Sequence, residues 1–306
     1  MNAIPLNRVP PRYSPHEAPS RLGSKPLAGS RMLLLLFNLS TFETMPTTNL
    51  LRVTCLVLLS GCAHSNLNVN RPAPATGVEL LQRMRDDYAG KWPRIITFVQ
   101  KTTITRPTGV VDTSTWYEAL KSPDRLRIDF GDPSKGNGAL YTADSLYVVR
   151  GGKITRTVGS GNPFLPFVAG VYDQPIATTL QQIAPYHFDL TRIRSDTWQG
   201  RPVYVVGATS PTDLDSPQFW IDRDRLIAVR FLVKLSPAPD AKPNDIRLEK
   251  YVPIGAGWLA THVAIMDGGV VRQAEDYTDW KGDMALSNDF FVAEKWSDVP
   301  HWFRGK

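Results

Sequence analysis

The sequence predicts a mainly β (α+β) protein, a curved antiparallel open β-barrel of about 11 strands with helices covering its concave face. From Ile95 onward, apolar and polar side chains alternate with a period of two, which is typical of half-buried strands. Short turns separate these runs, and they exclude the long crossovers that parallel strands need. The run Leu226–Val233 is apolar on both faces, so another layer must cover the second face.

Four residues, Leu59-Ser60-Gly61-Cys62, predict where the mature chain begins. They close the apolar run Val53–Leu59, which follows the lone cation Arg52, and this arrangement is similar to bacterial lipoprotein signals. In such signals the cysteine thiol receives a diacylglyceryl group, so Cys62 is the candidate lipidation site. A buried hydrophobic helix is the alternative, but the run is far shorter than the about 20 residues that span a bilayer.

The signal divides the chain into three parts. They are a leader and signal peptide (1–61), a flexible tether rich in Asn, Pro and Ala (62–75) and a single folded domain (76–306). Met45 is the expected true start because it places Arg52 in a normal n-region, and Met32 is a second choice. Ala63 stands where an Asp would signal inner-membrane retention in enteric bacteria. The expected location is therefore the periplasmic face of the outer membrane, with the acylated Cys62 as the anchor.

The charge and the cysteines exclude several classes of function. Much of the net charge of +6 lies in the leader, so the mature chain keeps a net charge of about +2. This charge does not predict a nucleic-acid partner. Cys55 and Cys62 leave no thiol pair in the mature domain, hence no disulfide and no cysteine metal site. The sequence has no nucleophile elbow, zinc motif or phosphate loop, so we expect no enzyme, cofactor or metal.

Two helices are expected. The first begins after Thr76, because Thr76-Gly77-Val78-Glu79 has the capping-box pattern. Its expected apolar face comprises Val78, Leu81, Met84 and Tyr88. The second helix has Asp173 as its expected N-cap and Pro175 in its first turn. Its expected apolar face comprises Ile176, Leu180 and Ile183.

The strands before and after the second helix are predicted by their alternation and by flanking turn residues. The earlier ones are Ile95–Thr105, Val110–Leu120, Leu126–Phe130, Leu140-Tyr141, Leu146–Val149 and Lys153–Thr157. The later ones are His187–Arg194, Pro202–Ala208, Gln218–Asp222, Leu226–Leu235, Ile246–Val252, Gly257–Met266 and Val270–Asp279.

Several short motifs, in this order, resemble the periplasmic lipoprotein carriers and receptors of the Lol system. After a helix, they are Phe98-x-Gln100-Lys101, a strand ending at Trp116, Lys121-Ser122-Pro123-x-Arg125-Leu126-Arg127, Gly161-Asn162-Pro163-Phe164 and the late Phe290-Phe291. The resemblance covers Thr76 to about Val292, and it is similarly close to uncharacterised exported proteins of that fold. It implies an open antiparallel barrel with a helical lid over an apolar cavity that takes acyl chains.

The resemblance also implies a latch. In the carrier an Arg just before the strand proline holds the lid, but here that position is Ser122. The latch is either missing or has passed to Arg125 or Arg127. A membrane-anchored member of this fold resembles the receptor more than the soluble shuttle.

The apolar stretch with two prolines, around Phe164–Val168, predicts a mouth or lid because it cannot form a buried strand. We expect acyl chains to enter beside it. The ligand-contact candidates are Phe164, Leu165, Phe167, Val168, Ile176, Leu180, Trp116 and Trp220. For the two tryptophans, core packing is the stronger alternative. An apolar cavity above roughly 300 Å³ between sheet and helices would match ligand sites.

Three functions follow from this reading. The first is a non-enzymatic, membrane-anchored lipoprotein that binds a lipid or the acyl chains of a lipidated protein, with a role in lipoprotein or lipid trafficking at the outer membrane. The second is a filled barrel that serves as an envelope sensor or as a binding module for a periplasmic protein partner. The third and least supported is a hydrolase.

Overall fold

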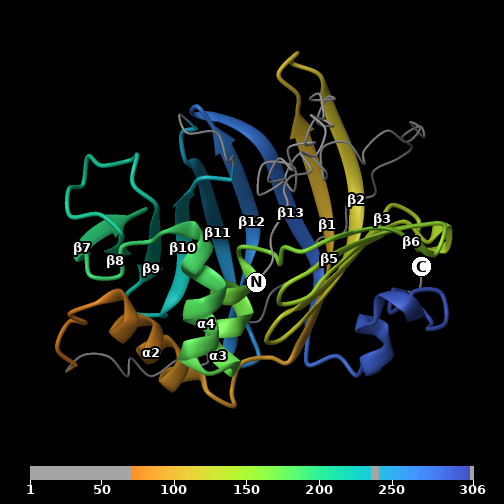
Figure 1. Cartoon of the computed structure of the whole chain (residues 1–306), viewed down its shortest axis with the longest axis horizontal. Coiled ribbons are helices and arrows are strands. Elements are labelled where there is room, and N and C mark those ends of the chain that lie inside the picture. The colour runs from red at the N-terminus through yellow and green to blue at the C-terminus, as the bar shows by residue number, and fades with distance from the viewer. Residues whose placement is uncertain (1–70, 236–240, 304–306) are drawn as a thin grey trace, which may run out of the picture.

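The computed structural model describes residues 71–235 and 241–303, which form one antiparallel sheet of 13 strands (Figure 1). The strands follow one another across the sheet in the order β6-β5-β4-β3-β2-β1-β13-β12-β11-β10-β9-β8-β7. The first six are β1 (Ile95–Thr105), β2 (Val111–Lys121), β3 (Arg125–Phe130), β4 (Gly138–Tyr141), β5 (Leu146–Arg150) and β6 (Lys153–Val158). The others are β7 (Ile193–Trp198), β8 (Arg201–Val206), β9 (Gln218–Asp222), β10 (Ile227–Val233), β11 (Asn244–Ile254), β12 (Gly257–Asp267) and β13 (Val270–Gly282).

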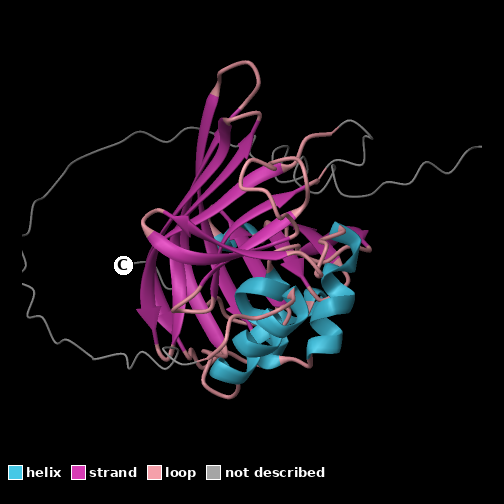
Figure 2. Cartoon of the chain, turned by 90° about the vertical axis from the view of Figure 1, so that its left-hand side faces the viewer, coloured by secondary structure: helices cyan, strands magenta, loops and turns pink. Residues whose placement is uncertain are grey.

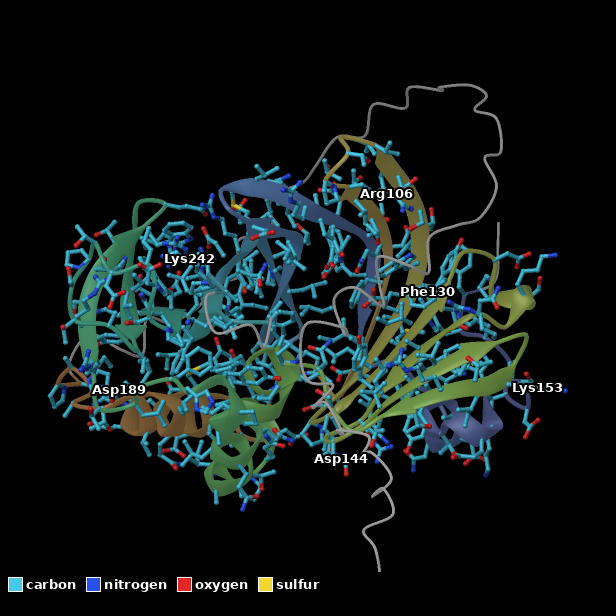
Figure 3. The ribbon with its side chains drawn as sticks, turned by 45° about the horizontal axis from the view of Figure 1, so that its top comes forward. Arg106, Phe130, Asp144, Lys153, Asp189 and Lys242 are labelled. Atoms are coloured by element: carbon cyan, nitrogen blue, oxygen red, sulfur yellow. The ribbon has the colours of Figure 1, made fainter. Side chains whose placement is uncertain are left out.

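The sheet is curved and open, as expected, but it is not closed into a barrel. Its edges are β6 and β7, and the first and last strands along the chain, β1 and β13, pair within it. It has 13 strands, more than the about 11 expected for the barrel as a whole, and the short segments β4, β5 and β6 are separate strands, as their individual ranges predicted. Lys153 in β6 lies at one end of the molecule, and Asp189 and Lys242 lie toward the other (Figure 3).

Helix α2, Gly77–Tyr88, begins as the capping pattern predicts. The Thr76 hydroxyl accepts a hydrogen bond from the Glu79 N–H at 3.1 Å, and the Glu79 carboxylate accepts one from the Ala75 N–H at 2.8 Å. The buried residues of this helix are Gly77, Leu80, Leu81 and Met84. Val78 was expected on the apolar face but is 39% exposed, so the buried face is turned toward Leu80.

The second helical region has three parts, a π-helical turn (Pro166–Gly170), α3 (Val171–Asp173) and α4 (Ile176–Ile183). The expectation that Asp173 caps the second helix is wrong. Asp173 is the last residue of α3, and α4 begins after Pro175, whose fixed φ suits that position, without a side-chain cap.

Gln174 joins α3 to α4. Its side-chain amide donates to the Thr179 hydroxyl at 3.0 Å and to the Gln182 carbonyl at 2.7 Å. The side chain is buried, and its neighbour Gly170 has no Cβ that would collide with it. The two short helices are therefore held together by one satisfied polar side chain.

The helices lie together on one side of the curved sheet (Figure 2). Here this side is called the inner face. The helices contribute Leu80, Leu81, Met84, Val171, Tyr172 and Ile183 to the largest apolar cluster, which includes residues of β8–β12. Burying a side chain of this size contributes about 1.5–3 kcal/mol, so this cluster is the main reason the helices stay on the sheet.

The outer face of β1–β5 is covered by the C-terminal segment. Two 3₁₀ turns, Asn288–Phe291 and Ala293–Lys295, bring Phe290, Phe291 and Trp296 against Ala119, Leu140 and Val149. Gly138 allows this close approach, since a Cβ there would lie 2.6 Å from the Trp296 ring. Both faces of the sheet are therefore covered around Ala119, Leu140 and Val149.

The expected strand His187–Arg194 is wrong over most of its length. His187 has φ 56°, which ends the 3₁₀ turn Ala184–Tyr186, and the Asp189 carboxylate accepts hydrogen bonds from the N–H and hydroxyl of Thr191. These turns replace strand pairing, so β7 begins only at Ile193. Within the described ranges 71–235 and 241–303, the helices are too short or too polar for any of them to cross a membrane.

Candidate functional site

An apolar hollow lies between the inner face of the sheet and the π-helical turn with α3. Its volume is about 160 Å³. Strands β1–β4 and β10–β13 supply one wall, and the segment 162–172 supplies the other. Most of the lining is apolar or aromatic, which is typical of sites that take apolar ligands.

Phe167 anchors the helical wall. It is 1% exposed, and its ring lies 4.9 Å from that of Phe219 and 5.0 Å from that of Phe231. The preceding Phe164 is partly buried, and its ring lies 5.7 Å from Phe231. The Asn162 side chain accepts the Phe164 N–H at 2.8 Å, which sets the direction of the chain as it enters the turn.

Tyrosine hydroxyls tie the helices to the turn between β9 and β10. The Tyr172 hydroxyl donates to the Leu226 carbonyl at 3.1 Å, and the Tyr88 hydroxyl donates to the Arg225 carbonyl at 2.6 Å. Burial raises the pKa of Tyr88 to about 12, so its hydroxyl keeps its proton and remains a donor across the neutral range.

The sheet wall carries a polar region where β1, β2 and β13 meet. Glu118 on β2 shares a face with Trp116 and Leu120, and all three line the cavity. Glu275 on β13 also lines it, and its carboxylate accepts from the Gln273 amide at 2.5 Å and the Tyr277 hydroxyl at 2.6 Å. The cavity therefore contains two carboxyl groups in an otherwise mostly apolar lining.

Both carboxyl groups have raised pKa values. Burial raises the pKa of Glu118 well above its ordinary value, and repulsion from Glu275 adds to this. Burial also raises the pKa of Glu275, although the hydrogen bonds from Tyr277 and Gln273 and the charge of His262 act in the opposite direction. The neutral form is thus favoured more strongly for Glu118 than for an exposed glutamate.

Five of the eight predicted ligand-contact residues lie on the cavity wall. They are Phe164, Leu165, Phe167, Val168 and Trp116. Ile176 and Leu180 are not among the described residues on that wall, and both pack against the main apolar cluster instead.

Trp220 also lies away from the cavity. Its neighbours Phe219 and Ile221 point to the inner face, so Trp220 points to the outer face, where its ring lies 5.4 Å from Trp198 and 4.7 Å from the Arg230 guanidinium. For Trp220 the sequence favoured core packing over ligand contact, and the observed position of its ring corresponds to core packing.

Arg125 and Arg127 do not lie at the helical lid. Leu126 and Ile128 line the cavity, so the two arginines between and beside them point to the outer face. Arg127 is 3% exposed, pairs through two hydrogen bonds with Asp129, and donates to the Phe290 carbonyl at 3.3 Å. Arg125 donates to the Phe291 carbonyl at 3.4 Å. Their contacts hold the C-terminal segment, which does not fit the role of a lid latch.

The two acids and several aromatic residues of the cavity wall, among them Trp92 and Tyr172, were not predicted from the sequence as ligand contacts. Glu118 follows Trp116 by two positions in a predicted strand, so the alternation alone places it on the same face as a ligand candidate. This alternation is a signal in the sequence from which Glu118 could have been predicted as a cavity residue. Trp92 and Tyr172 line the cavity from segments outside the strands, and no local pattern indicates that they meet.

The volume is smaller than the range set by typical ligand sites. About 160 Å³ lies below the roughly 300 Å³ that would match a site for a drug-sized ligand. It is close to the about 150 Å³ of an engineered apolar cavity that binds benzene. In this conformation the cavity can hold a short apolar segment, and a full acyl chain needs the helical wall to move outward.

The fold and this cavity define a class of protein, an open curved antiparallel sheet with helices packed over an apolar hollow. Solved structures match the chain at low sequence identity. A DUF1329 family protein from Desulfovibrio piger has a TM-score of 0.50 at 17% identity, covering 70% of this chain and 95% of that one. A putative outer membrane lipoprotein-sorting protein domain from Vibrio parahaemolyticus has a TM-score of 0.49 at 13% identity, covering 72% and 97%.

The LolA superfamily protein NE2245 from Nitrosomonas europaea has a TM-score of 0.46 at 13% identity, covering 72% of this chain and 98% of that one. Proteins of the Lol type, which the sequence motifs resemble, are among these structural matches, and a likeness at this identity concerns the fold alone. No protein-family model matches the sequence, and no curated protein matches it significantly.

Proposed function

We propose that this protein is a non-enzymatic lipoprotein of the cell envelope that binds an acyl chain, from a lipid or a lipidated protein, in the cavity between the inner face and the helices. The observation that carries the proposal is the cavity itself, apolar on the helical wall and lined by eight strands. Each CH₂ group moved from water into such a cavity contributes about 0.8 kcal/mol, so few polar contacts are needed.

Anchoring through Cys62 is part of the proposal. Cys62, the lipoprotein signal, the tether and the proposed start Met45 lie outside the described residues except for the end of the tether. Support comes from the signal pattern, which places an acylated cysteine before a tether and a folded domain. The proposed location is the periplasmic face of the outer membrane.

The volume favours a second candidate. A hollow of about 160 Å³ is small for a carrier, and it is compatible with a nearly filled sheet that serves as an envelope sensor or binds a protein partner. The two candidates differ in whether apolar molecules enter the hollow.

Native mass spectrometry of the full chain carrying Cys62→Ala, followed by lipid extraction, separates them. For the acyl-binding proposal we expect reproducible co-purified acyl species that are displaced in Ala260→Phe, because Ala260 lines the cavity. The matched control is Ala274→Phe, since Ala274 is partly buried on β13 but is not among the described residues on the cavity wall. Ligand-free spectra for the unsubstituted and both substituted chains contradict acyl binding and favour the protein-binding module.

A further inference from the structure

The polar region of the cavity has unused hydrogen-bonding capacity. Glu118 is 4% exposed, lies on the cavity wall, and makes no hydrogen bond to another described residue. The buried carbonyl oxygen of the Gln273 side chain also has no partner within the described part of the chain. Buried polar groups without partners cost free energy, so both groups point to a partner that enters with a ligand.

The missing partner is a hydrogen-bond donor with positive charge. Glu118, Gln273 and Glu275 all line the cavity, and each side chain carries an oxygen that accepts hydrogen bonds. Of the described residues that line the cavity, none is a lysine or an arginine. Repulsion from Glu275 raises the cost of ionising Glu118, and a cation between the two groups reverses that cost.

The surrounding titratable groups supply no such cation. Tyr141 on β4 and Tyr277 on β13 both have pKa values raised by burial and by the two acids, so they stay neutral. His262 on β12 points to the outer face, where its ring nitrogen lies 2.8 Å from the Asp276 carboxylate. Its charge acts on Glu275 only from a distance.

We propose that the cavity binds a single-chain amphiphile that ends in a primary ammonium group, with the ammonium between Glu118, Gln273 and Glu275. An ammonium group has three donors and no acceptor, which matches the three acceptor side chains. The alkyl chain lies along Phe98, Trp116 and the helical wall, all of which line the same cavity. The small volume fits one chain better than two. This inference rests on the proposed function, because the chain occupies the proposed acyl site.

The test compares dodecylamine, dodecanol and dodecanoate, which share one alkyl chain and differ in the polar end. Binding to the full chain carrying Cys62→Ala is measured by isothermal titration calorimetry at neutral pH. We expect dodecylamine to bind at least about tenfold more tightly than dodecanol, and dodecanoate to bind most weakly, because charged hydrogen bonds are stronger than neutral ones and a second anion is repelled.

Three variants locate the effect. Glu118→Gln and Glu275→Gln keep the size of the side chain and should each remove most of the preference for the amine while leaving dodecanol binding within about twofold. Glu294→Gln is the matched control, because Glu294 is exposed on the C-terminal segment. It should keep the full preference.

Each result decides between the two proposals. Equal binding of the three ligands, or a preference that survives both cavity substitutions, overturns the ammonium site and leaves acyl binding intact. Tighter binding of dodecanol than of dodecylamine also overturns it. Failure of all three ligands to bind overturns acyl binding itself. If Glu118→Gln does not fold, the comparison of ligands on the chain with native Glu118 and the Glu275→Gln variant still decide the question.

Discussion

The indole ring of Trp92 stacks on the phenol ring of Tyr172, with ring centroids 3.7 Å apart and planes at 18°. Trp92 lies between α2 and β1, and Tyr172 belongs to α3, so this stack joins two segments that are far apart in sequence. Tyr88 meets both rings edge-on, at 5.0 and 5.2 Å. Since Trp92 and Tyr172 both line the cavity, the stack fixes the position of its helical wall.

Replacing Trp92 should therefore loosen the helical cover. Trp92 is 7% exposed, and we expect Trp92→Ala to lower the free energy of unfolding by about 3–5 kcal/mol, the range for large aromatic truncations in cores. Part of this loss is the ring stacking, which contributes about 0.5–1.5 kcal/mol beyond buried area. Urea unfolding followed by circular dichroism measures it.

Trp280→Ala is the control for this prediction. Trp280 lies near the end of β13 and is 39% exposed, so its removal should change stability by less than about 0.5 kcal/mol. Equal losses for the two variants would show that the stack does not hold the helices.

Stability should depend on pH through Glu118. Burial, with repulsion from Glu275, raises the pKa of Glu118 in the folded chain. Below about pH 4.3, the pKa of a glutamate in the unfolded chain, Glu118 is protonated in both states and its contribution to the free energy of unfolding is fully present. That contribution is lost as the pH rises through the higher pKa of Glu118 in the folded chain. Glu118→Gln cannot ionise, so its stability relative to the unsubstituted chain should increase by about 1.4 kcal/mol for every pH unit between the unfolded pKa and the folded pKa.

Unfolding curves measured from acid to neutral pH test this. The exposed Glu294 offers the matched substitution, Glu294→Gln, whose stability should follow that of the unsubstituted chain at every pH. Parallel curves for Glu118→Gln and the unsubstituted chain would mean that the Glu118 carboxyl is not buried in the folded protein.

Arg127 should stabilise the protein without affecting the cavity. Its guanidinium lies 3.8 Å from the Trp296 ring centroid and pairs with Asp129, whose side chain is 1% exposed. Arg127→Met leaves a buried carboxylate without its main partner, so we expect a loss of about 3–5 kcal/mol in unfolding free energy. Alkyl-ligand affinity at a temperature where the variant is folded should remain within about twofold.

Arg125→Met is the comparison for Arg127→Met. The Arg125 side chain is 40% exposed, and its loss should cost less than about 1 kcal/mol. If Arg127→Met instead kept its stability and changed the rate of ligand exchange, the arginine would be acting on the lid after all.

Membrane attachment should depend on Cys62. We expect the unsubstituted protein to incorporate labelled palmitate and to fractionate with membranes, because the thiol is the proposed acceptor for the lipid. Cys62→Ala should abolish labelling. Cys55→Ala removes the other cysteine of the sequence and is the matched control, with labelling unchanged. Absence of label on the unsubstituted chain, or normal maturation of Cys62→Ala, would remove the anchor from the account.

The sequence predicted the elements whose signals are local. The alternation in Ile95–Thr105 gave β1 at its observed bounds, and the capping pattern at Thr76 gave the start of α2. The strand expected from His187 failed, because a positive φ and an aspartate turn outweigh the weak alternation there.

The surroundings of Trp220 and Arg127 could not be predicted in this way, because they are set by contacts between segments that are far apart in the sequence. All five residues of β9 are buried, so the alternation gave no indication that Trp220 faces away from the cavity. Arg127 was one of two alternatives for a lid latch that could also be missing, and its guanidinium donates to the Phe290 and Trp296 carbonyls of the C-terminal segment. Such pairings between distant segments appear only in the folded structure.

The central claim is that an apolar chain enters between the inner face and the helical wall. Photo-crosslinking with a fatty amine that carries a diazirine near the chain end tests it most directly, with the modified peptides identified by mass spectrometry. We expect modification at cavity residues such as Phe164, Phe167 and Trp116, and we expect it to be lost on competition with dodecylamine. Crosslinks confined to the outer face, around Trp220 or the C-terminal segment, would contradict it.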